Sequence, residues 1–458
     1  MTTRANRRGG DDALETRAQK VVERLNGVVA APSRVMYYPL IVREAHGSTV
    51  TDIDGRDYID FNAGWTVAAV GFSNPEVVAA VREELARSAG LPGGTFPSET
   101  TVRFAEKLVS MTPGSFPKRV WFGHSGTDAC AAAYKLFPVS TKRERCVTFY
   151  GGMHGIDLAG LAMGGIAATS RYRVPSLVSK VPYAYCYRCP YGLEYPSCGV
   201  HCASGFIEEQ LFKHVCPPDD TAFMMVEAMQ SDSGDVVPPK EYLPKLRRTA
   251  DRFGIALVAD EVKIGFGRTG EMFGVDHSRV VPDAVALGKS IASGMPVGAL
   301  VAREELFPQG FAYSTLVGNA IGTAAGIATI EIIERDRLPE RAAKLGRKLK
   351  RRLEEMKEAH PLIGDVRGEG LLLGVELVSD RKTKRPARLE TAKVVYRAWE
   401  LGLLTVFVGD DGNVIEITPP LVIQDEELEA GAEILDRAIA DVERGLVPDS
   451  VVRPYTGM

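Results

Sequence analysis

The sequence lacks a long hydrophobic run, a strong charge of either sign and any visible internal repeat. None of its apolar stretches approaches the roughly 20 residues that a membrane-spanning helix requires. The first residues, MTTRANRRGGDD, carry charge but are not followed by the apolar segment of a secretory signal. A net charge of −4 gives no reason to expect nucleic acid or an anionic membrane as a partner. We therefore expect a cytoplasmic protein whose residues 1–20 form a disordered tail.

Cysteine is scarce for a disulfide-stapled fold, since the 458 residues contain seven, an odd number. Three lie apart in apolar contexts and are expected to be buried thiols: Cys130, Cys146 and Cys216. The other four are clustered with the spacing CxxC, eight residues, CxxxC: Cys186, Cys189, Cys198 and Cys202. The spacing leaves two interpretations open. The cluster is either a site for zinc or an iron–sulfur cluster, or a loop of free or disulfide-linked thiols.

Short apolar runs alternate with helical patterns through the middle of the chain. The runs predict strands at residues 119–123, 145–150, 222–227, 255–260, 284–288 and 296–302. Several are continuously apolar, as in a parallel sheet that is covered on both faces. Helices are predicted at residues 76–89, 126–137 and 240–253. This alternation predicts a large α/β domain, which we place at residues 85–330.

The pattern changes after residue 330. A charged amphipathic helix is expected at 340–358, followed by strands at 371–378 and 414–417 and helices at 390–402 and 425–444. These elements predict a small α+β domain at residues 331–458. The segment 47–61 has a DG turn between strand-like runs, which is typical of a hairpin. We expect residues 21–84 to join the small domain.

Lys289 directly follows a buried apolar run in the sequence DAVALGKSIASG. The letters GKS suggest a phosphate-binding loop, but Asp283 stands where that motif requires glycine. The lysine is therefore either structural or a nucleophilic amine of the kind that forms a Schiff base.

Other polar residues stand at the ends of the predicted strands, which converge on one crevice in an open α/β sheet. Asp260 ends the run IALVAD, and His154 follows the run at 145–150. Ser125, Gly126 and Thr127 open a predicted helix, whose N-terminus is a natural phosphate site. An amine nucleophile, a buried acid and a phosphate cradle together indicate pyridoxal phosphate (PLP) as cofactor.

The stretches TVTDIDGRDYIDF, DEVKIGFGRTG and LGKSIASGMPVGA, in this order, resemble the class III aminotransferases of fold type I. That family includes ornithine and 4-aminobutyrate aminotransferases and glutamate-1-semialdehyde aminomutase. The resemblance extends to VIEITPPLVI and so covers nearly the whole chain. It implies a mostly parallel seven-stranded sheet flanked by helices, a smaller α+β domain and a homodimer with shared active sites. It also implies PLP, a small-molecule amine substrate and an oxo-acid acceptor.

The resemblance also implies roles for single residues. Lys289 corresponds to the Schiff-base lysine that moves the substrate proton, Asp260 to the partner of the pyridine nitrogen, and Val262 to an apolar contact on the ring. The phosphate cradle corresponds to Ser125, Gly126 and Thr127. The remaining implied cofactor contacts are Met153, His154, Glu227, Gln230 and Thr315. Met153 stands where the family usually has a stacking aromatic, and Thr315 corresponds to a threonine that reaches the phosphate of the neighbouring subunit.

Two departures from the family concern the substrate. Glu416 stands in VIEITPPL where many members have an arginine that binds a substrate carboxylate. A free carboxylate there would favour a cation, so one hypothesis is an amine, polyamine or aminosugar donor. The alternative is that Glu416 pairs with a lysine or arginine of the protein. Lys263 replaces a neutral residue and is either a surface lysine or, with Trp65, part of the substrate site.

The preferred interpretation is a PLP-dependent aminotransferase that acts through a Lys289 Schiff base. A racemase, an epimerase, an aminomutase or an elimination enzyme of the same family would use the same lysine and acid. The sequence does not distinguish these reactions, because they differ only in the fate of the carbanion. A more distant alternative is a metal–thiolate protein built on Cys186–Cys202.

Overall fold

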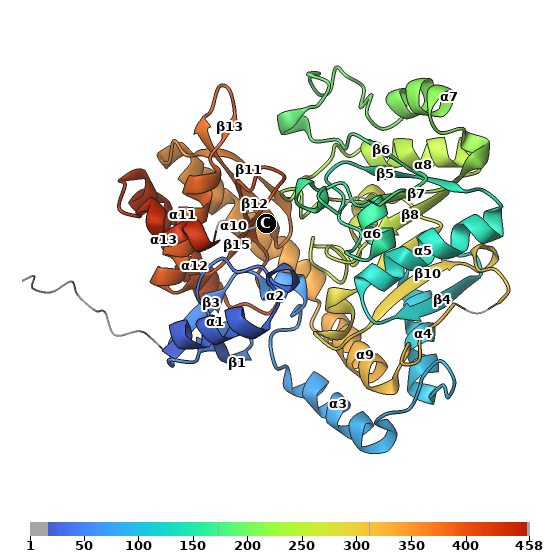
Figure 1. Ribbon diagram of the computed structural model, residues 1–458, viewed down its shortest axis with the longest axis horizontal. Coiled ribbons are helices and arrows are strands. Elements are labelled where there is room, and N and C mark those ends of the chain that lie inside the picture. The colour runs from blue at the N-terminus through green and yellow to red at the C-terminus, as the bar shows by residue number, and fades with distance from the viewer. Residues whose placement is uncertain (1–16, 173, 311, 456–458) are drawn as a thin grey trace, which may run out of the picture.

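The computed structural model describes residues 17–172, 174–310 and 312–455. Figure 1 shows the middle of the chain gathered around one large sheet, and both ends of the chain gathered beside it. The predicted tail at residues 1–16 lies outside the described residues. Residues 17–20 were wrongly assigned to that tail, because they form the first turn of helix α1 (Arg17–Val28), which buries Ala18. No helix among the described residues has both the length and the apolar character needed to cross a membrane.

The large sheet has seven strands in the order β4-β10-β9-β8-β7-β5-β6. Their bounds are β4 (Lys118–Gly123), β5 (Arg145–Phe149), β6 (Val178–Val181), β7 (Thr221–Glu227), β8 (Ala256–Asp260), β9 (Ala284–Leu287) and β10 (Gly298–Arg303). Strand β10 is antiparallel to both of its neighbours, and the other four pairs are parallel. The predicted seven-stranded, mostly parallel sheet of fold type I is therefore confirmed.

The two faces of this sheet contribute to different apolar clusters, because successive side chains of a strand point to opposite faces. In β7, Phe223 and Met225 pack with helix α5 (Gly126–Thr141), whereas Met224 and Val226 pack on the face that carries α8 (Tyr242–Phe253). Every residue of β7 is buried. This burial on both faces is the physical reason why the central strands are continuously apolar.

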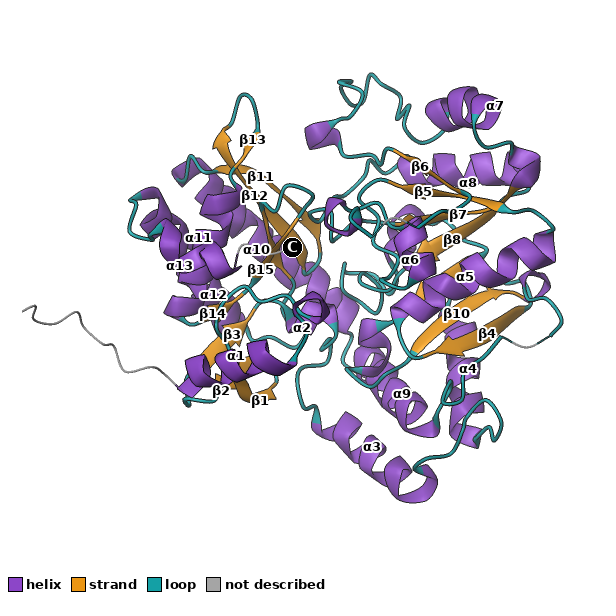
Figure 2. Cartoon of the chain, in the orientation of Figure 1, coloured by secondary structure: helices purple, strands orange, loops and turns teal. Residues whose placement is uncertain are grey.

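Further helices surround the sheet, as Figure 2 shows. Their bounds are α3 (Pro75–Ser88), α4 (Glu99–Met111), α6 (Leu158–Met163), α7 (Phe212–His214) and α9 (Ala320–Arg335). Helix α3 begins where the Asn74 side chain accepts the first free backbone N–H groups, and α8 ends at Gly254 in a left-handed conformation.

The two ends of the chain form two smaller sheets. One has the order β1-β2-β3-β14, with β1 (Val42–His46), β2 (Thr49–Asp52), β3 (Asp57–Asp60) and β14 (Leu403–Leu404). The parallel pairing of β3 with β14 joins residues far apart in the sequence. The other contains β11 (Ile363–Glu369), β12 (Leu372–Asp380), β13 (Arg385–Pro386), β15 (Val406–Val408) and β16 (Val414–Ile417). The domain boundaries themselves stay a prediction.

The described C-terminal residues after α9 contain the helices α10 (Leu338–Ala359), α11 (Arg388–Leu401), α12 (Asp425–Glu443) and α13 (Asp449–Val452). The charged helix α10 buries Leu345, Leu349, Leu353 and Met356, which recur at helical spacing and form its apolar stripe.

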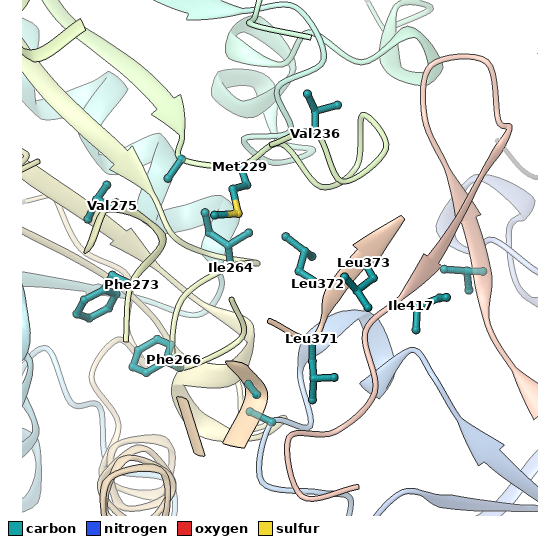
Figure 3. Packing of buried hydrophobic residues seen from close by; sticks show 14 of the residues in the cluster. Met229, Val236, Ile264, Phe266, Phe273, Val275, Leu371, Leu372, Leu373 and Ile417 are labelled. Carbon is teal, nitrogen blue, oxygen red and sulfur yellow. The ribbon is translucent and has the colours of Figure 1, made fainter. Parts of the chain in front are cut away.

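One apolar cluster runs from the large sheet into the small sheets. Figure 3 shows Met229 and Ile264 facing Leu372 and Leu373 of β12. Arg268 is buried beside this junction and donates hydrogen bonds to the carbonyls of Leu371 and Pro419. The junction therefore holds the segment after β8, which carries Val262 and Lys263, against the small sheets.

Candidate active site

A cavity of about 310 Å³ lies where several strands of the large sheet end. The predicted site residues that line it are Ser125, Gly126, Thr127, Met153, His154, Glu227, Asp260, Val262, Lys263 and Lys289. These residues are distant in sequence and lie at the ends of β7 and β8 and in the segments that follow β4, β5, β8 and β9. The convergence at strand ends is the arrangement expected of a ligand crevice in an α/β sheet.

Asp260 ends strand β8 and is only 3% exposed. Its Oδ2 lies 2.8 Å from Nδ1 of His154 and 3.3 Å from the thiol sulfur of Cys130, and its Oδ1 accepts the Val262 N–H at 3.0 Å. Burial opposes protonation of His154, but the hydrogen bond and charge of Asp260 raise its pKa. The carboxylate is therefore held by three groups and aimed at the cavity.

Lys289 follows β9 in a left-handed backbone conformation, with φ of 48°. Such a conformation is rare for residues other than glycine and is often found at functional sites. Burial, together with the nearby charge of Lys263, lowers the pKa of the Lys289 ammonium. The side chain is thus more readily available as a neutral, nucleophilic amine than an ordinary lysine.

The first turn of α5 forms the anion-binding end of the cavity. Ser125 caps the helix by accepting the Asp128 N–H at 3.2 Å, whereas the N–H groups of Gly126 and Thr127 have no acceptor within the helix. The backbone comes very close to the segment after β8: a Cβ at Gly126 would lie 2.4 Å from Cγ1 of Val262. A phosphate fits such a helix N-terminus, which supplies free N–H donors and a positive dipole end.

Glu227 ends strand β7, and burial raises its pKa to about 7. Its Oε1 accepts the Met153 N–H at 2.9 Å, and its Oε2 accepts the Ser231 N–H at 3.4 Å. Gln230 does not line the cavity. Its side chain donates to the Tyr150 carbonyl at 2.9 Å and so positions the loop that carries Met153.

Lys263 and Glu416 form a buried ion pair. The distance from Lys263 Nζ to Glu416 Oε1 is 2.5 Å, and the two side chains are 5% and 0% exposed. The ammonium also lies 3.3 Å from Oδ1 of Asp232 and 4.9 Å from the ring centre of Trp65. The interpretation of Lys263 as a surface lysine is therefore wrong.

The hypothesis of a free Glu416 carboxylate facing the substrate is wrong as well. Glu416 does not line the cavity, and the structure has the alternative arrangement, in which it pairs with a lysine of the protein. The physical reason is that a buried charge is very costly without a partner. The hypothesis of a cationic donor assumed a free Glu416 carboxylate in the substrate site, and this assumption no longer holds.

Thr315 is exposed and does not line the cavity of its own chain. Its neighbour Ser314 places Oγ 2.8 Å from Nε2 of His124, which lies at the cavity wall beside Ser125. The role of Thr315 toward a neighbouring subunit stays a prediction.

Of the titratable side chains that line the cavity, three were not predicted as site residues from the sequence: His124, Cys130 and Asp232. Cys130 had a usable signal, because it follows Gly126 by four residues on the same face of α5. His124 and Asp232 lie in loops without periodicity, so only the folded chain places them.

The four clustered cysteines form no disulfides, and no three of their sulfur atoms all lie within 4.8 Å of one another. Among the described residues, Cys130, His154 and Asp260 are the only such group whose ligand atoms lie within 4.8 Å of one another, and they belong to the cavity already described. The predicted metal site at Cys186, Cys189, Cys198 and Cys202 has no support in this geometry.

A reactive lysine, a buried carboxylate and a helix N-terminus at the ends of a fold type I sheet define a PLP-dependent enzyme. The model of the class III aminotransferase family matches residues 29–439, and the chain belongs to this family. PLP is accordingly its cofactor, and the residues of the cavity fit its ring nitrogen, aldehyde and phosphate.

The relatives include enzymes with different names. The chain is 40% identical to the leucine/methionine racemase of Thermococcus litoralis, over 95% of this chain and 99% of the racemase. It is 36% identical to the diaminobutyrate–2-oxoglutarate aminotransferase of Rhizobium meliloti, over 86% of both chains. Among solved structures, an aminotransferase of Bacillus anthracis superposes with a TM-score of 0.85 at 28% identity, covering 92% of this chain and 98% of that one.

Proposed function

We propose that the enzyme transfers the amino group of an amine or amino acid to an oxo acid, with Lys289 as its reactive amine. The observation that carries this proposal is that one cavity is lined both by Lys289, whose pKa is lowered, and by Asp260. PLP supplies an electron sink for the bond that breaks at the substrate's α-carbon. Every other task falls to side chains and backbone groups of the chain.

Lys289 has two tasks, each at its Nζ atom. As a neutral amine its Nζ would hold the cofactor, and in the presence of substrate it would take the proton from the α-carbon. The lowered pKa of Lys289 favours both tasks, because only the neutral amine has a lone pair.

Asp260 and the first turn of α5 orient the cofactor. The carboxylate, fixed by His154 and the Val262 N–H, would accept a hydrogen bond from the protonated ring nitrogen. The free N–H groups of Gly126 and Thr127 bind the phosphate. Val262 offers an apolar surface beside them, since its side chain packs against Gly126.

The proposal includes a homodimer in which Thr315 completes the phosphate site of the neighbouring subunit. Its support is the exposure of Thr315 between two exposed apolar side chains, Tyr313 and Leu316. Light scattering of the holoenzyme should give twice the mass of one chain. The cytoplasmic location stays a prediction.

A second candidate function is racemisation or epimerisation of an amino acid. It is favoured by the 40% identity to a leucine/methionine racemase, which exceeds the 36% identity to an aminotransferase. The same Lys289 would remove the α-proton, and only the face on which a proton returns would differ.

One experiment tests the proposal and separates the two candidates. Purified holoenzyme is incubated with single enantiomers of amino acids and with amines, with and without 2-oxoglutarate or pyruvate, and products are resolved on a chiral column. We expect product only when the oxo acid is present, and none with Lys289→Ala. Inversion of one amino acid without any oxo acid would select the second candidate. Cofactor absorbance that survives Lys289→Ala unchanged would refute the assignment of this lysine.

A further inference from the structure

The cavity contains a second lysine whose task the proposed function does not assign. Among the described residues that line the cavity there is no arginine, and the lysines are Lys263 and Lys289. Lys289 is committed to the amino group and the cofactor. Because His154 is bound to Asp260, the cation in these walls that remains for a substrate carboxylate is the ammonium of Lys263.

The surroundings of Lys263 are built to keep it charged and in place. Burial opposes its charge, but the carboxylates of Asp232 and Glu416 raise its pKa above the ordinary range of lysine. The Lys263 backbone carbonyl accepts a hydrogen bond from the Thr66 hydroxyl at 3.1 Å. The ring of Trp65 lies on another side of the ammonium at 4.9 Å.

The turn that carries Trp65 has an unusual backbone. Ala63, Trp65 and Thr66 have positive φ angles of 51°, 62° and 65°, which side-chain-bearing residues rarely adopt. Hydrogen bonds impose this shape, because Asp60 accepts the Ala63 N–H at 2.7 Å and Asn62 accepts the Trp65 N–H at 2.7 Å. Strained backbone that is held in this way is typical of functional sites.

The two carboxylate partners of Lys263 are not equivalent. Glu416 is the closer, at 2.5 Å, and lies outside the cavity, whereas Asp232 is at 3.3 Å and lines it. An ammonium has three N–H donors, so a carboxylate entering the cavity can replace or join Asp232 while Glu416 keeps its bond. Glu416 is therefore the structural partner of Lys263, and Asp232 is the partner that a substrate carboxylate can replace.

We propose that Lys263 is the receptor for the substrate carboxylate, so that the enzyme acts on amino acids and oxo acids rather than on simple amines. The inference rests on the proposed function, since it assumes that Lys289 takes the amino group. It makes Lys263 a binding residue that sets specificity, with Asp232 as its partner in the absence of substrate. Trp65 and Glu416 then act as positioning residues.

The test compares Lys263→Met with the wild type on an amino acid and on its decarboxylated amine, for example leucine and 3-methylbutylamine. In Lys263→Met we expect kcat/KM for leucine to fall roughly 10- to 100-fold more than kcat/KM for the amine, because leucine loses a charge-assisted hydrogen bond. The fall should come mainly from a higher KM for leucine. Lys263→Arg should recover part of this loss. Lys348→Met, at a lysine that is 44% exposed, is the matched control and should change neither substrate.

A second measurement does not depend on turnover. Binding of 3-methylbutanoate, which has the carboxylate but no amine, is titrated through the absorbance of the bound cofactor. We expect Lys263→Met to weaken this binding at least 10-fold and Asp232→Asn to strengthen it. Lys263→Met leaves the carboxylate of Glu416 unpaired. Both measurements are therefore repeated on the double variant Lys263→Met with Glu416→Gln, whose site lacks the Glu416 charge.

The outcomes are separable from those of the proposed function. If the enzyme turns over no substrate, the transfer reaction fails, but the carboxylate titration still decides the role of Lys263. Equal losses on leucine and on the amine would overturn the inference. Unchanged binding of 3-methylbutanoate by Lys263→Met would also overturn the inference. The same holds if a cation such as a diamine, and not a carboxylate, competes for this site by binding at Asp232.

Discussion

The buried pair of Lys263 and Glu416 makes an asymmetric prediction about stability. Lys263→Met leaves the carboxylates of Glu416 and Asp232 near each other without a cation, and removal of one partner from a buried pair costs about 3–5 kcal/mol. Glu416→Gln leaves Lys263 paired with Asp232 at 3.3 Å, so its cost should be nearer 1–3 kcal/mol. The lysine variant should therefore be the less stable of the two.

The assay is thermal unfolding of the enzyme without added cofactor. An unfolding entropy of roughly 2.1 cal/mol/K per residue means that this 458-residue chain loses about 1 °C in Tm per kcal/mol. We expect Tm to fall by about 3–5 °C in Lys263→Met and by about 1–3 °C in Glu416→Gln. The double variant should be more stable than Lys263→Met alone, because removing both partners is close to neutral.

The pH dependence gives a further check. Burial raises the pKa of Glu416, so the folded state binds the proton of this carboxyl more tightly than the unfolded state does. A raised acid pKa destabilises the folded state above that pKa, and the destabilisation disappears as pH falls. Loss of the Lys263 charge raises the pKa of Glu416 further, so the Tm deficit of Lys263→Met should shrink on acidification. A deficit that is absent at pH 8, or equal in the two single variants, would refute the reasoning.

Three further predictions concern the cavity and its scaffold. Gly126→Ala should weaken PLP binding at least 10-fold in a fluorescence titration of the apoenzyme, because its Cβ would lie 2.4 Å from Val262; unchanged affinity would contradict the cradle. Cys130→Ala should shift the pH midpoint of the cofactor absorbance and Cys130→Ser should restore it, since the thiol donates to Asp260; equal spectra in both variants would exclude this contact. Glu261→Ala should cost about 1–3 kcal/mol, because two buried backbone N–H groups lose their acceptor, while cofactor absorbance stays normal; loss of absorbance would show that Glu261 is more than scaffold.

The main elements could be predicted from the sequence because their causes are local. Continuous apolar runs gave the buried strands of the large sheet, and helical spacing located α3, α5, α8 and α10 within a few residues. The residues at the strand ends also identified the cofactor class, since Asp260 ends one buried strand and Lys289 follows another. Helix α1 was not predicted, because it is largely polar and buries only Ala18.

The remaining parts of the site depend on contacts between distant segments. Gln230 has the residue type of a cofactor contact, yet the fold turns its amide toward the Tyr150 carbonyl. The spacing of the four clustered cysteines permits a metal site, but spacing does not determine how closely the sulfur atoms approach, and no three of them all lie within 4.8 Å of one another.

The sequence by itself determined the fold class and the cofactor chemistry, because apolar periodicity and strand-end residues act over a few positions. Only the tertiary structure decided the meaning of Lys263 and Glu416, which are 153 positions apart and oppositely charged. Packing of the segment after β8 against β16 buries both side chains together. Burial then requires each charge to have a partner, and this requirement leaves the ammonium of Lys263, rather than the carboxylate of Glu416, at the wall of the cavity.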